Sequence, residues 1–172
     1  GVQLSDQVGG VVGVHLFAHV CRTLGVQGGD HVHLFVLREL LERFAPGMIA
    51  LSGCLSGRVS RAISEGRDRD AEAELDRLEQ IFGRDNTYVE LQNAGLDIQQ
   101  PVFNQLPGLA AKRGLPLVAT GDVHYLDAAD AYAHEALLCI QSADSLKNPN
   151  HWKFGTNEFY FKSPQEMALD FP

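Results

Sequence analysis

The stretch Leu115-Pro-Leu-Val-Ala-Thr-Gly-Asp-Val-His-Tyr-Leu126 decides the fold, because a short apolar run in it ends abruptly in an Asp-x-His pair. The run from Leu115 to Thr120 is typical of a parallel strand that is buried on both faces. Residues two apart along an extended backbone point the same way, so Asp122 and His124 should present a carboxylate and an imidazole to one small volume. The pair indicates a metal-binding position, and a turn-capping aspartate beside a surface histidine is the alternative.

Two more strands are expected upstream of this stretch. Met48–Leu51 is a short apolar run that ends in Ser-Gly-Cys54, and Thr87–Gln92 is rich in β-branched and aromatic residues. Helical spacing of apolar residues predicts helices over about 37–44, 56–65, 68–82 and 98–113. Pro107 should kink or shorten the last of these. Strands that alternate with helices indicate an α/β fold with parallel strands and outer helices.

The candidate ligands share a position in this pattern. Cys54, Asp122 and His124 all fall just beyond the C-terminal ends of predicted strands, where sites collect in parallel sheets and barrels. A thiolate, a carboxylate and an imidazole together suit zinc, with manganese or iron as alternatives. Two other interpretations of Cys54 stay open, a nucleophile near a helix N-terminus and a plain buried thiol. His31-Val-His33 can be interpreted as a second ligand pair or as incidental histidines.

The composition sets outer bounds on the function. The chain has 172 residues, 45% of them hydrophobic and 21% charged, which is ordinary for a soluble globular protein. Its formal net charge of -8 makes it a poor candidate for binding nucleic acid through its overall field, whereas acidic character suits metal binding. Three cysteines at unrelated spacings argue against a disulfide framework and favour the cytoplasm. No segment looks like a signal peptide or a membrane span.

The C-terminal part predicts three more elements. Asp127 and Asp130 open a helix, and Glu158–Phe161 should form a short aromatic strand. Ser163-Pro-Gln-Glu166 is a capping box with Pro at the first helical position, which is a strong helix start. Because the chain stops about two turns later, we expect it to be a fragment of something longer.

Five motifs in register resemble the later part of the PHP (polymerase and histidinol phosphatase) domain of the bacterial DNA polymerase III alpha subunit. The resemblance covers about residues 37–172. The motifs are Met48-Ile-Ala-Leu-Ser-Gly-Cys54, Tyr88-Val-Glu-Leu91, Pro116-Leu-Val-Ala-Thr-Gly-Asp-Val-His-Tyr125, His134-Glu-Ala-Leu-Leu-Cys-Ile-Gln141 and Phe159-Tyr-Phe-Lys-Ser-Pro-Gln-Glu-Met167.

The resemblance implies a fold and a site. The fold is a distorted (β/α)7 barrel similar to a TIM barrel, with its metal cluster at the C-terminal ends of the strands. Cys54, Asp122 and His124 match three metal-binding positions of the family. Residues 37–142 would then be a partial PHP barrel, residues 143–172 a connector and the start of the next polymerase region, and residues 1–36 stay unassigned because they do not look like the family.

The resemblance also implies activities and partners. In some members the metal cluster supports 3′-5′ exonuclease proofreading, whereas in others the domain is a catalytically inactive scaffold that binds a proofreading exonuclease subunit. The full-length subunit contacts DNA primer-template and other replicase subunits, and its polymerase site uses magnesium on a palm domain absent from this sequence. His31 and His33 should not be equated with the family's first motif, which lies far upstream of the cysteine. Most of the ligand set is therefore missing, and we expect the isolated chain to be inactive.

Overall fold

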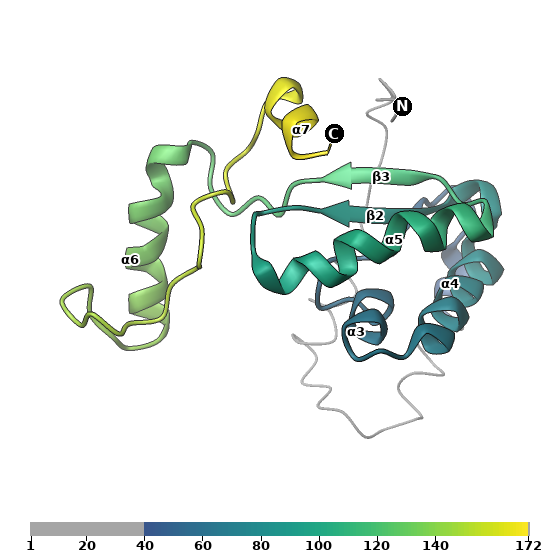
Figure 1. Ribbon diagram of the computed structural model, residues 1–172, viewed down its shortest axis with the longest axis horizontal. Helices are drawn as coiled ribbons and strands as arrows, with labels where there is room; N and C mark the ends of the chain where they lie inside the picture. Colours follow the sequence, from purple (N-terminus) through teal and green to yellow (C-terminus); the bar gives the residue numbers. More distant parts are fainter. Residues whose placement is uncertain (1–39, 172) are drawn as a thin grey trace. The chain divides into compact units, whose positions relative to one another are not determined.

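The computed structural model describes residues 40–171 and shows an α/β fold (Figure 1). Three strands form one sheet in the order β1-β2-β3, namely β1 (Ala50–Leu51), β2 (Thr87–Gln92) and β3 (Leu117–Thr120). Strand β1 pairs with β2 in parallel, with Ala50 opposite Thr87 and Leu51 opposite Tyr88. The arrows of β2 and β3 also point the same way in Figure 1. The predicted α/β class with parallel strands is confirmed, while the closed barrel stays a prediction.

Helices connect and follow the strands. Residues 40–44 are helical, and the later helices are α3 (Arg58–Ser64), α4 (Asp68–Phe82), α5 (Gln100–Arg113), α6 (Ala131–Gln141) and α7 (Pro164–Asp170). Short 3-10 turns lie at Arg84–Asn86, Asp97–Gln99 and Ala128–Asp130. The capping box predicted at Ser163 and Glu166 is present, with the Glu166 N–H donating to Ser163 Oγ at 3.3 Å.

The hydrophobic core of the first part of the chain forms where helices pack beside the sheet. Ala45, Ala50 and Phe82 make a buried cluster, against which partly buried side chains pack; these are Leu41, Met48, Leu78 and Ile81. Helix α4 buries Ala71 and Leu75 from its apolar stripe, as its helical spacing predicts. Leu75 is completely buried.

Two expectations about single elements were wrong, and a third was wrong in part. Strand β3 is only half-buried throughout, because it lies at the end of the strand order and has one neighbouring strand in the described sheet. The expected strand at Glu158–Phe161 reduces to one parallel bridge between Tyr160 and Tyr125. Helix α5 runs through Pro107 without being shortened; the proline removes one backbone donor, but buried Val102, Leu106 and Ala110 anchor the helix on both sides of it. A kink at Pro107 stays a prediction.

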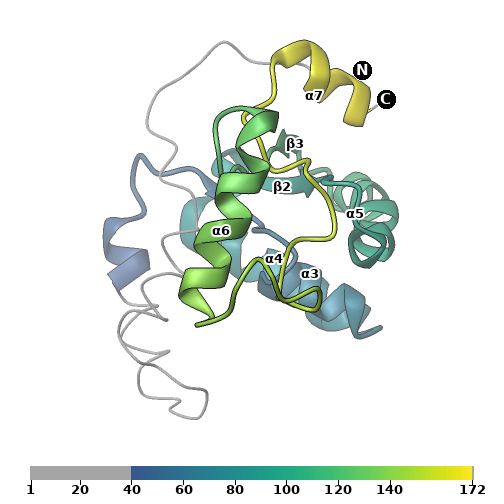
Figure 2. The same cartoon turned by 90° about the vertical axis from the view of Figure 1, so that its left-hand side faces the viewer.

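The described chain divides into two compact units. One contains residues 40–91 and 101–118, and the other contains residues 92–100 and 119–171. Within the second unit, the segment that follows α6 runs back alongside that helix before it reaches α7 (Figures 1 and 2). In the described range, no helix has both the length and the apolar character that crossing a bilayer requires.

Candidate functional site

The loop after β1 positions Cys54 in the first unit. Gly53 has a φ of +92°, a left-handed conformation that favours glycine, and it turns the chain out of the strand. Gly57 has no room for a side chain, because a Cβ would lie 2.9 Å from the carbonyl oxygen of Cys54. The Cys54 Sγ atom is half-buried and lies 3.1 Å from the Ser56 hydroxyl. The predicted ligand is thus held on a tight loop rather than inside a regular element.

Glu90 fixes this loop to β2. Its carboxylate accepts a hydrogen bond from the Gly53 N–H at 3.1 Å, and its own N–H donates to Ser52 Oγ at 2.9 Å. Glu90 is only 3% exposed, so a carboxylate is buried directly beside the cysteine loop. This residue was not predicted from the sequence. The available signal was a charged residue inside a strand whose other members are mostly apolar, since such charges are rarely buried without partners.

Asp122 and His124 lie in the second unit, on the irregular segment after β3. The imidazole Nδ1 of His124 lies 2.7 Å from the carbonyl oxygen of Asp122, and the His124 N–H donates to the Phe159 carbonyl at 2.8 Å. A carbonyl oxygen can only accept, so Nδ1 carries the proton and Nε2 of the neutral ring is left as a lone-pair donor. This tautomer leaves Nε2 able to ligate a metal ion.

His124 is exposed to solvent, and three aromatic rings lie close to its imidazole. Its ring lies 5.0 Å from Phe154, 5.2 Å from Phe159 and 5.5 Å from His134 between centroids, each in an edge-on arrangement. Burial lowers the pKa of His134, and the neighbouring His124 lowers it further. His134 is therefore neutral near pH 7, and its ring packs from α6 against those of His124, Tyr125 and Phe154.

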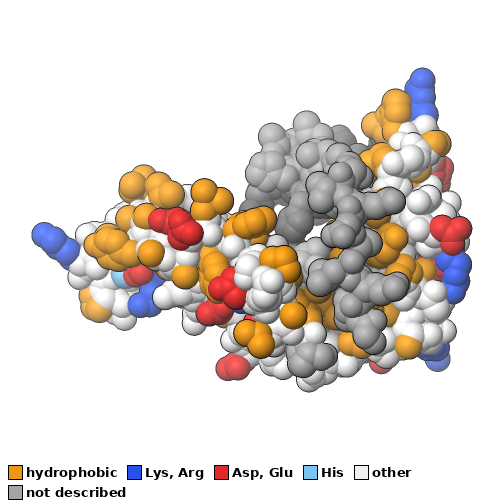
Figure 3. Space-filling view, turned by 90° about the horizontal axis from the view of Figure 1, so that it is seen from above, with side chains coloured by type: hydrophobic (Ala, Val, Ile, Leu, Met, Phe, Trp, Pro, Cys, Tyr) orange, Lys and Arg blue, Asp and Glu red, His pale blue; other side chains and the backbone are white. Residues whose placement is uncertain are grey.

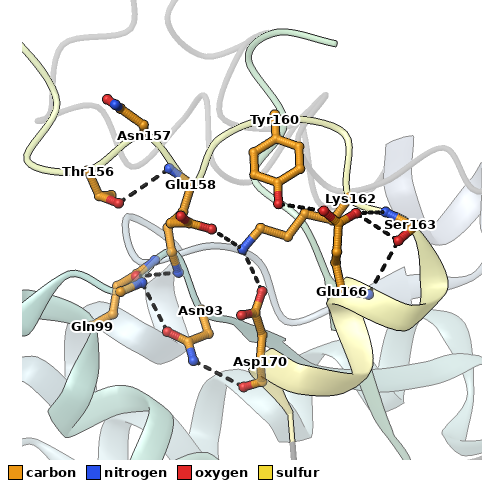
Figure 4. Close-up of polar contacts among 12 residues, drawn as sticks. Asn93, Gln99, Thr156, Asn157, Glu158, Tyr160, Lys162, Ser163, Glu166 and Asp170 are labelled. Carbon is orange, nitrogen blue, oxygen red and sulfur yellow. Dashed lines mark hydrogen bonds and ion pairs between the residues drawn. The ribbon is translucent and has the colours of Figure 1, made fainter. Parts of the chain in front are cut away.

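A buried ammonium organises the segment that carries Phe159 (Figure 4). Lys162 has a side chain only 6% exposed, and its Nζ pairs with Glu158 at 2.7 Å and with Asp170 at 2.6 Å. Burial alone would lower the pKa of Lys162, but the hydrogen bonds to Asp170 and Glu158 outweigh it and raise the pKa. Lys162 thus joins α7 to the strand-like segment that pairs with Tyr125.

The three predicted ligands are divided between the two units, with Cys54 in one and Asp122 and His124 in the other. Within the range 40–171, no group of three or more His, Cys, Asp or Glu side chains is arranged to hold a metal ion. His31 and His33, the other candidate pair, lie outside the described residues. The assignment of Cys54, Asp122 and His124 as ligands stays a prediction.

The sequence matches one protein family and is similar to several known proteins. Residues 14–94 match the PHP domain family, so the match includes Cys54 and begins inside the segment that the sequence left unassigned. The chain is 43% identical over 134 residues to the DNA polymerase III subunit alpha of Treponema pallidum, which covers 78% of this chain and 12% of that protein.

Two further relatives carry the same name. The subunit of Thermus aquaticus is 46% identical over 135 residues, which covers 78% of this chain and 11% of that protein. The subunit of Deinococcus radiodurans is 37% identical over 158 residues, which covers 91% of this chain and 12% of that protein. The chain therefore spans about an eighth to a ninth of the length of these curated relatives.

Proposed function

Because residues 14–94 are a PHP domain and the chain is homologous to bacterial DNA polymerase III alpha subunits, we propose that it supplies part of a metal-dependent site that hydrolyses DNA 3′ ends within a replicative polymerase subunit. Cys54, Asp122 and His124 are its proposed ligands. In this proposal the three-stranded sheet is a section of a distorted (β/α)7 barrel. Zinc fits the thiolate and imidazole donors, and manganese or iron are the alternatives.

The observation that carries the proposal is the hydrogen bond between His124 Nδ1 and the carbonyl oxygen of Asp122. The Nδ1 atom lies 2.7 Å from the carbonyl oxygen of Asp122, and the rings of His134, Phe154 and Phe159 lie within 5.5 Å of the imidazole between centroids. A surface histidine with no role would gain nothing from this restraint and would lose side-chain entropy. A preset Nε2 lone pair is what ligation requires.

Each proposed ligand has a distinct task. When bound, divalent ions would supply Lewis acidity and lower the pKa of a water molecule. Cys54 would contribute a thiolate from a loop that Glu90 holds in place, and the Asp122 carboxylate would contribute negative charge that offsets the charge of the ions. His124 would contribute a neutral nitrogen from the second unit.

A hydrolysis assay tests this proposal. The full-length polymerase subunit that contains this chain, loaded with zinc or manganese, is incubated with a single-stranded oligonucleotide labelled at its 5′ end, so that stepwise shortening from the 3′ end is visible. We expect shortening that EDTA abolishes and that the Asp122→Ala, His124→Ala double variant reduces at least about tenfold. Asp85→Ala, which removes an exposed carboxylate from the other unit, is the matched control and should leave the rate unchanged. Equal rates for the double variant and the control would overturn the proposal.

The second candidate function is a scaffold that binds another protein subunit, such as a proofreading exonuclease. Helix α6 favours it, because Tyr132, Leu137 and Ile140 are 69%, 62% and 75% exposed, and apolar side chains gather over this helix in Figure 3. If the scaffold function alone is correct, the Asp122→Ala, His124→Ala variant changes neither metal content nor hydrolysis. Substitutions on α6 would then be the ones that weaken subunit binding.

A further inference from the structure

A pocket of about 390 Å³ lies between α6 and the returning segment 153–157, wholly inside the second unit. Its volume falls in the range of pockets that hold small molecules. None of the proposed ligands Cys54, Asp122 and His124 lines it. Two of its lining rings, His134 and Phe154, also contact the ring of His124, so the pocket borders this proposed ligand without containing it.

Aromatic rings form part of the wall. Tyr125, His134 and Phe154 all line the pocket, with the His134 ring 5.3 Å from Tyr125 and 5.0 Å from Phe154 between centroids. Stacking on such rings is the usual way in which proteins hold a nucleobase regardless of its identity. The rings thus favour a ligand with a flat, aromatic part.

The wall carries one positive and one negative side chain. Glu135 and Lys153 are the lining residues with full charges, and Glu135 is already occupied by His151, whose Nε2 lies 2.5 Å from the carboxylate. The other ring nitrogen of His151 lies 2.5 Å from the Asn148 carbonyl oxygen. Both nitrogens therefore face acceptors, which favours a protonated ring that pairs with the Glu135 carboxylate. Lys153 makes no ion pair within residues 40–171, so its charge is available to an anion.

We propose that this pocket binds a nucleotide, with the base against the rings of Tyr125, His134 and Phe154 and the phosphate beside the ammonium of Lys153. The nucleotide is either free or the end of a single strand, and both share this chemistry. The overall charge of -8 does not exclude such a site, because a nucleotide is recognised by local contacts rather than by the field of the whole chain.

The single tryptophan of the chain provides a direct probe. Trp152 lies edge-on to Phe154 with 5.4 Å between ring centroids, so its fluorescence should change when the pocket fills. The full chain is titrated in EDTA with thymidine 5′-monophosphate, thymidine, inorganic phosphate and a short single-stranded oligothymidylate. EDTA removes divalent ions, so this result does not depend on the proposed hydrolysis.

Two variants and their matched controls define the expected result. Lys153→Ala removes the charge and should weaken nucleotide binding about tenfold, whereas Lys147→Ala removes an exposed charge from the same segment without touching the pocket. Ala131→Leu fills the pocket from α6, whereas Ala133→Leu adds the same volume at an exposed position of that helix. Only the first variant of each pair should weaken binding.

The series of ligands distinguishes a site for a free nucleotide from a site for the end of a single strand. Saturable binding of thymidine 5′-monophosphate, at least about tenfold tighter than thymidine or phosphate alone, supports the proposal. Tighter binding of the oligonucleotide than of the mononucleotide assigns the pocket to a strand end, and equal binding assigns it to free nucleotide. The proposal is overturned if neither thymidine 5′-monophosphate nor the oligonucleotide saturates the pocket. It is also overturned if Lys153→Ala binds as tightly as Lys147→Ala and Ala131→Leu as tightly as Ala133→Leu.

Discussion

At the scale of single residues, the cysteine loop depends on a glycine that was not noticed in the sequence. Gly57 has a φ of −65°, so its backbone suits any residue, and the constraint is steric. A Cβ there would meet the carbonyl oxygens of Cys54 and Ser52 at 2.9 and 3.1 Å. Both are backbone atoms of the loop that presents the proposed thiolate ligand, so they cannot give way without moving it.

We therefore predict that Gly57→Ala lowers the free energy of unfolding by about 1–3 kcal/mol. Gly108→Ala is the matched control, because this glycine lies inside α5 with nothing within 4 Å of its Cβ position. The control should gain about 0.5–1 kcal/mol, since alanine is the better helix former. Urea unfolding of both variants checks this. A Gly57→Ala protein as stable as the parent chain would show that the loop is not tightly packed.

Some residues of the candidate site could be predicted from the sequence, and others could not. Asp122 and His124 could be selected because an Asp-x-His pair after an apolar strand is a compact and unusual pattern. The partners of Glu90 and Lys162 could not be selected from the sequence. Those of Lys162, Glu158 and Asp170, are only four and eight positions away, but they meet it through the turn into α7. Glu90 bonds to Gly53 across 37 positions, and such pairing depends on tertiary structure.

At the scale of elements, α6 and the segment after it are joined by one titratable contact. His151 has a side chain only 7% exposed, and it bridges the Asn148 carbonyl and the Glu135 carboxylate. The hydrogen bond to Asn148 raises the pKa of His151, and the bond to Glu135 raises it further, while nearby Lys153 opposes them. Asp144 also lies within electrostatic reach of the ring.

This contact predicts a pH dependence with a definite sign. Because the pKa is raised in the folded chain, the stabilisation is complete below the unfolded value of about 6.5 and is lost as pH rises through the folded value. Amide exchange in residues 148–154 should therefore accelerate above that pH, beyond the intrinsic increase, and an NMR titration should place the His151 pKa above 6.5. Glu135→Gln should shift the His151 pKa downwards. A His151 ring that titrates below 6.5 in the parent chain would contradict the prediction.

Elements with a strong local signal were predicted well. Helix α4 and strand β2 occur with the expected bounds, because their periodicity and their Gly and Asn neighbours mark both ends. The expected strand at Glu158–Phe161 failed, since aromatic content favours a strand but pairing requires a partner edge. In the described structure Tyr125 provides that partner at one position only.

At the scale of the whole molecule, the alternation of strands and helices in the sequence predicted the α/β class. Five motifs in the same order as in the PHP domain predicted the family. How the site assembles could not be predicted. Cys54 belongs to one compact unit and Asp122 with His124 to the other, so local patterns cannot define the distances among them. The match to the PHP domain family begins at residue 14, so it includes residues whose sequence has no clear periodic pattern.

The central claim is that Cys54, Asp122 and His124 bind one metal cluster, and cobalt(II) substitution tests it most directly. A cobalt–thiolate bond gives a charge-transfer absorption that carboxylates and imidazoles do not produce. We predict this absorption in the parent chain and in the control variants Cys21→Ser and Cys139→Ser, its loss in Cys54→Ser, and weaker cobalt binding in Asp122→Ala and His124→Ala. An unchanged absorption in Cys54→Ser, or no cobalt retained by the parent chain, would contradict the claim.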